Sequence, residues 1–167
     1  MRCFKKIIQF GSRSTANEAE EVVMAKIKDV ALYFLHLESR HGGEGLSHLK
    51  LQKLAYYAQG FYVALYGEPL FEDDIEAWTH GPVVPSLYHE YKHCSSSKIP
   101  YAEDFKADSF SKDELELIED VFQEFGQYSA WKLRNMTHEE PTWMDYESDN
   151  SVIPISHLRE YFSTRIA

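Results

Sequence analysis

Histidine and acidic residues occur together at two places where their spacing is compatible with metal or acid–base chemistry. His89 and His93 stand four residues apart, which puts both imidazoles on one face of a helix, and His138 is followed directly by Glu139 and Glu140. Neither place forms the HExxH pattern that joins two zinc-binding histidines to a catalytic glutamate. The sequence therefore favours exposed helical histidines, and we expect no metal and no other cofactor.

Motifs for nucleophilic catalysis and phosphate binding are also missing from the sequence. Cys94 precedes three serines without a base close to it in the sequence, and no G-x-S-x-G elbow is present. Residues 42–45, Gly-Gly-Glu-Gly, lack the Lys-Ser/Thr of a phosphate-binding loop and favour a helix stop and turn. We expect no catalytic residue. The enzyme alternative is a small hydrolase that uses His80 or His138 with a nearby carboxylate.

The most unusual composition lies in the segment EAWTHGPVVPSLYHEY, residues 76–91. Gly81-Pro82 can bend the chain, and Pro85 cannot lie inside a helix without displacing a hydrogen bond. A helix is therefore expected to begin at Pro82 or later. We expect a stiff corner with Trp78 and Tyr88 packed beneath it.

Hydrophobic residues at spacings of three and four predict the helices that position this corner. Ser47, Ser111 and Ser129 are placed to cap helices, and Ser111 with Glu114 forms a capping box. The predicted helices run from Ala25 to near Arg40, from His48 to Tyr66, from Pro82 or later to about His93, from Ser111 to Gly126, from Ser129 to before Pro141, and from Ser156 onward.

Two short extended segments complete the predicted fold. The residues around Ile75 lie between turn signals, and residues 151–155, SVIPI, are a candidate strand to pair with them. Residues 94–110 are predicted to be a loop. Gly60 interrupts the longest helix, which indicates close approach of a neighbouring helix. The prediction is a mainly α fold, a compact single-domain helical bundle with a small β ribbon.

Aromatic residues crowd the predicted helix over residues 48–66. Tyr56 and Tyr57 are adjacent and point about 100° apart, so it is difficult to bury both together with Phe61 and Tyr62. Aromatic stripes are usually core, yet exposed tyrosine and tryptophan are enriched at protein interfaces. We therefore expect exposed aromatic side chains in this part of the chain.

Composition limits the classes of partner. The 167 residues suffice for one core, and a formal net charge of −10 disfavours direct binding of nucleic acid. The sequence contains no apolar run of the roughly 20 residues that cross a membrane. Cys3 and Cys94 form no metal or disulfide pattern, which fits the cytoplasm. The acidic C-terminal part leads us to expect a positively charged partner, and residues 1–23 are expected to be a flexible extension.

Three stretches together resemble one family. Residues 49–71 (LKLQKLAYYAQGFYVALYGEPLF), 75–92 (IEAWTHGPVVPSLYHEYK) and 128–143 (YSAWKLRNMTHEEPTW) are similar to the Panacea antitoxin domain, which includes SocA-like antitoxins and phage-associated GepA-like proteins. The resemblance runs from about Met24 to Phe162. It implies the antitoxin half of a two-gene toxin–antitoxin pair, with no catalytic centre. One branch of the family delivers its toxin to a Clp-type protease.

The resemblance and the composition lead to one functional prediction. Residues 24–167 are expected to form a Panacea-like antitoxin domain that binds and neutralises a cognate toxin. We expect Tyr56, Tyr57, Trp78 and His80 to lie near the partner surface. The alternatives are a phage-associated protein that binds a host factor, or an adapter that delivers a partner to a Clp-type protease. A DNA-binding repressor is disfavoured by the net charge.

Overall fold

The computed structural model describes residues 23–101 and 105–166. The predicted flexible extension over residues 1–23 lies, except for Val23, outside the described residues. The described helices include none with both the length and the apolar composition of a membrane span.

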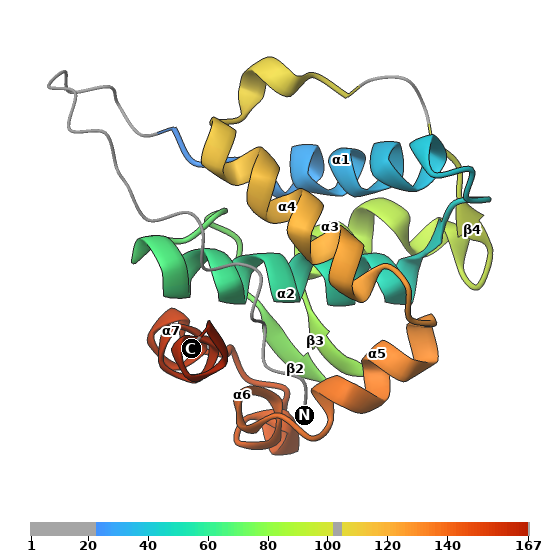
Figure 1. The fold of residues 1–167 in the computed structure, drawn as a ribbon. Helices are drawn as coiled ribbons and strands as arrows, with labels where there is room; N and C mark the ends of the chain where they lie inside the picture. The colour runs from blue at the N-terminus through green and yellow to red at the C-terminus, as the bar shows by residue number, and fades with distance from the viewer. Residues whose placement is uncertain (1–22, 102–104, 167) are drawn as a thin grey trace, which may run out of the picture.

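One long helix forms the centre of the molecule (Figure 1). This helix, α2 (His48–Tyr66), contacts α1 (Ile27–Arg40), α4 (Lys112–Phe125), α5 (Ala130–Thr137) and α7 (Ile155–Ile166). In Figure 1, α1 and α4 lie on one side of α2 and α7 on the other. The mainly α fold with a minor β component is confirmed.

The interior position of α2 follows from its composition. Every residue from Leu51 to Val63 is buried, as expected for a helix with apolar residues on all sides. The Ser47 side chain accepts a hydrogen bond from the Lys50 amide, and Gly67 ends the helix with a φ of 80°. Both predicted ends of this helix are therefore confirmed.

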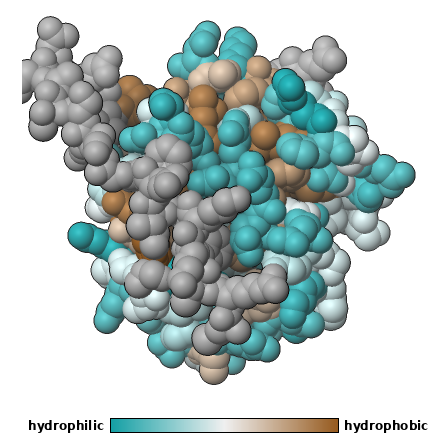
Figure 2. Space-filling view, viewed as in Figure 1, coloured by the Kyte–Doolittle hydropathy of each residue, from teal (hydrophilic) through white to brown (hydrophobic). Residues whose placement is uncertain are grey.

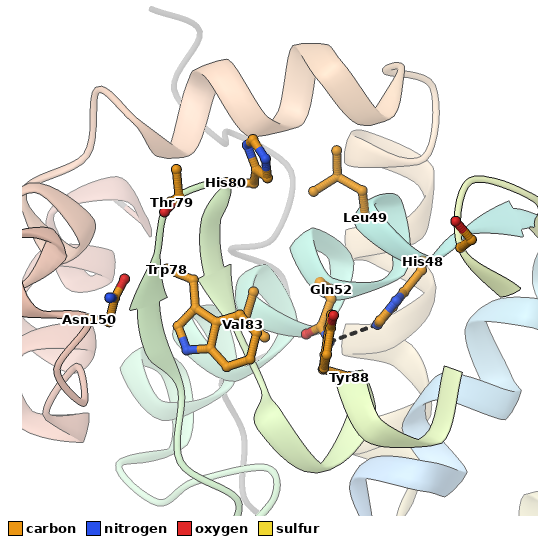
Figure 3. A pocket seen from close by; sticks show the side chains of 10 residues that line it. His48, Leu49, Gln52, Trp78, Thr79, His80, Val83, Tyr88 and Asn150 are labelled. Atoms are coloured by element: carbon orange, nitrogen blue, oxygen red, sulfur yellow. Dashed lines mark hydrogen bonds between the residues drawn. The ribbon is translucent and has the colours of Figure 1, made fainter. Parts of the chain in front are cut away.

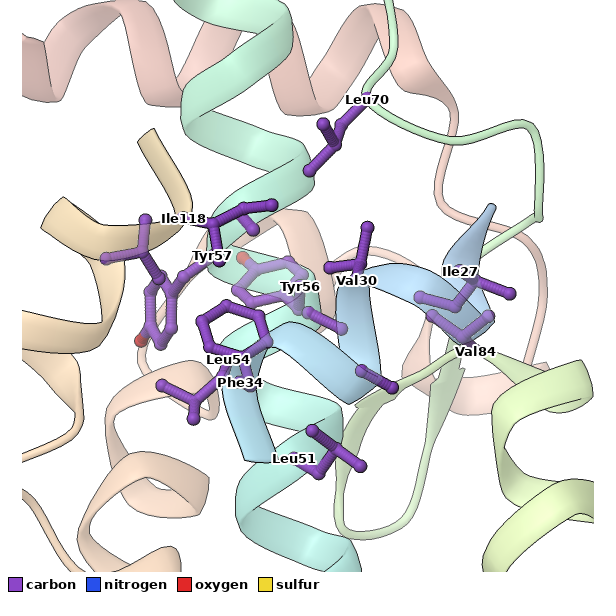
Figure 4. Packing of buried hydrophobic residues seen from close by; sticks show 14 of the residues in the cluster. Ile27, Val30, Phe34, Leu51, Leu54, Tyr56, Tyr57, Leu70, Val84 and Ile118 are labelled. Carbon is purple, nitrogen blue, oxygen red and sulfur yellow. The ribbon is translucent and has the colours of Figure 1, made fainter. Parts of the chain in front are cut away.

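The core lies between α2 and its neighbours (Figure 4). Val30 and Phe34 of α1 pack with Leu51 and Leu54 of α2, and Ile118 reaches the same cluster from α4. The face of the molecule seen in Figure 2 is mostly hydrophilic outside this cluster. The bundle thus has one continuous hydrophobic core across the described residues.

Gly60 marks the closest approach between two helices. A Cβ atom built at Gly60 would lie 2.3 Å from the Cε2 atom of Phe162 on α7. The predicted reason for an interior glycine in α2 is therefore confirmed.

The β component has two small antiparallel sheets. Strand β2 (Glu76–Trp78) pairs with β3 (Gly81–Val83), and Val152 adds an isolated bridge to Glu76. The Ile153 amide donates to the Ile75 carbonyl over 2.8 Å, which confirms the predicted contact of SVIPI with this segment.

The second sheet corrects the prediction of an unpaired loop over residues 94–110. Strand β1 (Leu46–Ser47) pairs with β4 (Lys98–Ile99) inside that segment. Ile99 is buried, so a single apolar residue anchors an otherwise polar stretch. Two-residue strands carry too little alternation to be recognised from the sequence.

Proline sets the start of two helices. Helix α3 (Pro85–Tyr91) begins with Pro85 in its first turn, as predicted, and a 3₁₀ turn (Lys92–Cys94) continues it. Helix α6 (Pro141–Met144) was not predicted, because Pro141 was interpreted only as the end of α5. Helix α7 begins at Ile155, one residue before the predicted serine. The remaining short elements are 3₁₀ turns over Ala107–Ser109 and Glu147–Asp149.

Candidate functional site

The structure separates the four residues that the sequence places near a partner surface. Tyr56 and Tyr57 have no exposed surface. Trp78 is half-buried, His80 is exposed, and both border one surface cavity. The expected exposure of the two tyrosines is therefore wrong, because helices pack on several sides of α2 and enclose even neighbouring side chains. A role of Trp78 and His80 at a partner surface stays a prediction.

Tyr56 and Tyr57 hold a buried carboxylate instead. The Tyr56 hydroxyl donates to Oε2 of Glu140 over 2.5 Å, and the Tyr57 hydroxyl donates to Oε1 over 3.0 Å. Arg165 of α7 donates to the same Oε1 over 2.8 Å. Burial raises the pKa of the Glu140 carboxyl, while the hydrogen bonds and the Arg165 charge oppose that rise. The two tyrosines thus connect α2 to α7 through one shared carboxylate.

The surface cavity has a volume of about 620 Å³ and lies beside α2, α3 and the β2–β3 hairpin (Figure 3). Leu49, Trp78, Val83 and Tyr88 give it apolar walls. The rings of Trp78 and Tyr88 meet edge to face, with centroids 5.0 Å apart, which confirms that these residues pack together. We call this volume the hairpin cavity.

The floor of the hairpin cavity consists of polar groups that already have partners. The side-chain oxygen of Gln52 accepts from the Val84 amide over 2.8 Å, and its NH₂ group donates to the Val84 carbonyl over 3.2 Å. The same nitrogen lies 3.2 Å from Nε2 of His48 (dashed line in Figure 3). Burial, followed by the charge of Lys53, lowers the pKa of His48. This floor is a fixed network with few free donors or acceptors.

A buried lysine fixes the turn above the cavity. Lys53 Nζ donates to the Pro82 carbonyl over 2.8 Å, and Lys53 has no exposed surface. Burial, followed by the charge of Arg134, lowers the pKa of Lys53 to about 7. Gly81 has a φ of 99°, and a Cβ atom there would lie 2.7 Å from Oγ1 of Thr137. Only glycine therefore fits this corner.

Helix α5 brings exposed aromatic and basic groups to the rim of the cavity. The Trp131 side chain is 58% exposed, and its ring lies 6.3 Å from the ring of His80. The Arg134 guanidinium stacks over Trp131, 5.1 Å from the ring centroid. His138 stacks on Trp143 with centroids 3.7 Å apart, and the Trp143 indole donates to the Trp78 carbonyl. We call Trp131, Arg134, His80 and His138 the basic flank.

The basic flank has unsatisfied polar atoms. Nε of Arg134 and Nε2 of His138 are buried without a hydrogen-bond partner among the described residues. Burial, together with the charges of Arg134, Lys53 and His80, lowers the pKa of His138 to about 4. Most buried polar atoms in proteins have a hydrogen-bond partner, so these two atoms distinguish the basic flank.

Two strained residues line the same cavity. Among the described residues, Ser95 and Asn150 are the non-glycine positions with positive φ, at 49° and 53°. Asparagine tolerates this region better than serine does, since its short polar side chain can bond locally. Strained backbone persists where the surrounding structure holds it, and such positions cluster at binding sites.

The hydrolase alternative requires histidine beside a carboxylate, and the geometry differs. Burial lowers the pKa of His138 most, and the charged groups that add to this shift, Arg134, Lys53 and His80, are all bases. His89 packs against the ring of Tyr88. No group of three or more His, Cys, Asp or Glu is placed to hold a metal ion within residues 23–101 and 105–166.

Sequence reasoning missed Lys53, Ser95, Arg134 and Asn150 as parts of the site. A lysine inside an apolar helix, as Lys53 is, is itself a signal of a buried charge. Ser95 lies just after the 3₁₀ turn that follows α3, but Arg134 and Asn150 come from segments far from the hairpin in sequence. Helix α5 packs against β3, and the 147–151 turn packs against β2.

Comparison with known proteins connects this geometry to a family. A family model described as Antitoxin SocA-like, Panacea domain, matches residues 51–144, which is more than half of the chain. Antitoxin SocA of Caulobacter vibrioides (strain NA1000 / CB15N) is 42% identical over 55 residues. That match covers 33% of this chain and 27% of the relative, so the chain matches about a quarter of that protein's length. No solved structure matches the chain. The family match over residues 51–144 means that the chain belongs to the SocA-like antitoxins with a Panacea domain.

Proposed function

We propose that this protein is the antitoxin of a two-gene toxin–antitoxin pair and that it neutralises a co-encoded toxin by direct binding. The observation that carries this proposal is the family match, because residues 51–144 include most of α2, the β2–β3 hairpin and α5. We treat residues 24–167 as one antitoxin domain. Trp78 and His80 belong to its contact surface.

The shape of the hairpin cavity supports binding to another protein. Tryptophan and arginine are enriched among the residues that dominate interface energies, and Trp131 and Arg134 lie beside His80 at its rim. Lys53 and Gly81 fix the turn. A preformed surface loses little conformational entropy when a partner binds.

A role in binding, without catalysis, accounts for the environments of the side chains around the hairpin cavity. The histidine most strongly shifted in pKa, His138, is surrounded by bases, and the polar floor around Gln52 is occupied by internal hydrogen bonds. Side chains in these environments hold the binding surface in a fixed shape, but they transfer protons poorly.

Co-expression tests the proposal. We expect the adjacent reading frame to stop growth when it is induced alone, and this chain to restore growth and to copurify with its product. Trp131→Ala and His80→Ala should weaken rescue, while Lys112→Ala, an exposed change on α4, should not. An adjacent product that is harmless, or that stays toxic in the presence of this chain, contradicts the proposal.

A further inference from the structure

The hairpin cavity combines open apolar surface with a polar floor that is already engaged. Gln52 bonds to Val84 through both atoms of its amide, and the Trp78 indole donates to Glu76 over 2.7 Å. The other polar residues that line the cavity include the exposed His80 and Asn150. The walls formed by Leu49 and Val83 favour an apolar side chain.

The charges around the cavity are asymmetric. On the side of α5, the basic flank includes Arg134, and no carboxylate in the described part of the chain forms an ion pair with it. On the opposite side lie Glu76, which Trp78 contacts, and Asp149, next to Asn150. An acidic group of a bound segment is thus attracted toward α5 and repelled from the other side.

The basic flank is exceptional in a chain with a formal net charge of −10. Helix α5 itself contains Lys132 and Arg134 and no acidic residue. Nε of Arg134 and Nε2 of His138 are buried and lack hydrogen-bond partners among the described residues. The Arg134 guanidinium lies over the exposed Trp131 ring, and the exposed His80 lines the cavity. Basic side chains at the edge of an open apolar cavity fit a ligand that supplies both a carboxylate and an apolar side chain.

We propose that the hairpin cavity binds an acidic segment of the protein partner, with an apolar side chain seated between Trp78 and Leu49 and a neighbouring carboxylate on Arg134 and His80. This inference rests on the proposed function, because it names the part of the toxin that the antitoxin recognises. It also revises the expectation of a positively charged partner at this face. The strained backbone at Ser95 and Asn150 holds the rim in the shape that the segment requires.

The three tryptophans of the chain allow a direct test, because all of them lie at this site. Trp78 lines the cavity, Trp131 belongs to its rim, and the Trp143 indole donates to the Trp78 carbonyl. Indole N–H signals in NMR spectra of the ¹⁵N-labelled chain therefore report on the hairpin cavity alone. The probes are short synthetic peptides with one phenylalanine flanked by aspartates, by lysines or by serines.

We expect the aspartate peptide to shift the indole signals of Trp78 and Trp131 at millimolar concentration and the lysine peptide to leave them unchanged. Arg134→Glu should weaken binding of the aspartate peptide by about tenfold, and Leu49→Ala should weaken binding of both the aspartate and the serine peptide. Lys112→Glu on α4 is the matched charge reversal away from the cavity and should bind as the wild type does. Unchanged far-UV circular dichroism shows that each variant is folded.

Two further outcomes separate this inference from the proposed function. Indole signals that do not respond to the aspartate peptide, or that respond equally to the lysine peptide, overturn the inference. If the toxin copurifies equally well with Arg134→Glu, Leu49→Ala and the wild type, the antitoxin function stands and the site is wrong. If no toxin copurifies with the wild type but the aspartate peptide binds, the proposed function fails and the site stands.

Discussion

At the scale of single residues, the buried Lys53 is the costliest group in the candidate site. Its ammonium group has one hydrogen bond, to the Pro82 carbonyl, and no carboxylate partner in the described residues. Burial opposes its charge, and the nearby Arg134 adds to that effect, so its pKa falls to about 7. A neutral lysine still donates to Pro82, which explains how the turn tolerates it.

The lowered pKa of Lys53 predicts how stability changes with pH. Between about pH 7 and the ordinary lysine pKa, the unfolded chain binds a proton that the folded chain does not, so the free energy of unfolding rises with pH. The slope approaches ~1.4 kcal/mol per pH unit. We expect urea unfolding from about pH 7.5 to about pH 9.5, below the ordinary tyrosine pKa, to show this rise.

Lys53→Met should remove the slope, and Lys112→Met, which changes an exposed lysine, should keep it. The methionine variant also leaves the Pro82 carbonyl without its donor, at a cost of about 1–3 kcal/mol, so the informative quantity is the slope and not the absolute stability. Equal slopes in the Lys53→Met variant and the wild type contradict the assignment.

At the scale of elements, helix ends were predictable because their signals are local. Ser111 accepts from the Glu114 amide and Glu114 accepts from the Ser111 amide, as the capping box requires. Ser129 caps α5 as expected, and α3 begins at Pro85, within the predicted range of Pro82 or later. The two-residue strands β1 and β4 were missed, because their pairing depends on partners about 50 residues apart and on no local pattern.

The contact between α2 and α7 predicts that Gly60→Ala lowers the free energy of unfolding. Alanine favours a helix over glycine by about 1 kcal/mol, but its Cβ atom would lie 2.3 Å from Phe162. Phe162 is fully buried and cannot move away freely, so overpacking should outweigh propensity and destabilise the protein by about 1–3 kcal/mol. Urea unfolding measures the loss.

The control for this contact replaces Phe162 with a smaller residue. Gly60→Ala should cost much less in a Phe162→Leu background, where the space beside the new Cβ atom is free, and the interaction energy of the two changes should be favourable. A more stable Gly60→Ala single variant shows instead that α7 shifts to accommodate the methyl group.

The buried ion pair between Glu140 and Arg165 predicts how firmly α7 is held. Arg165→Ala leaves the Glu140 carboxylate with two tyrosine donors and no opposite charge, at a cost of about 3 kcal/mol. Arg159→Ala, an exposed change on the same helix, is the matched control. Of these two variants, only Arg165→Ala should accelerate hydrogen exchange of the α7 amides. Adding Glu140→Gln to Arg165→Ala removes the unpaired carboxylate and should recover part of the lost free energy of unfolding. Equal costs for the two arginines contradict this role.

At the scale of the whole molecule, the sequence predicted the fold class and the corner, while three-dimensional packing decided which residues form the site. Trp78 and His80 were recognised from the composition of one segment. The sequence predicted exposed positions for Tyr56 and Tyr57, but both are buried. The reason is that α7 covers one face of α2, which the sequence pattern does not show. Asn150 lines the cavity, and α5 with Arg134 lies beside the hairpin, only through long-range packing, which no local pattern reports.

The distribution of charge leads to a last prediction, which concerns salt. A formal net charge of −10 destabilises the compact state through mutual repulsion, and added salt screens that repulsion. Salt also weakens surface ion pairs, but the exposed lysine pairs Lys28–Glu90, Lys98–Glu44 and Lys112–Glu116 contribute about 0–1 kcal/mol each. Repulsion among the many acids should therefore dominate the response.

We expect the midpoint of thermal unfolding to rise as sodium chloride increases from about 0.01 M to about 0.15 M, over which the screening length falls from about 30 Å to about 8 Å. Glu147→Gln combined with Asp149→Asn removes two exposed acids and should raise the midpoint at low salt and reduce its salt dependence. Lys112→Gln adds to the net negative charge and should have the opposite effect on both. A midpoint that falls with salt would show that the loss of attractive ion pairs outweighs the relief of repulsion, because salt weakens both kinds of interaction.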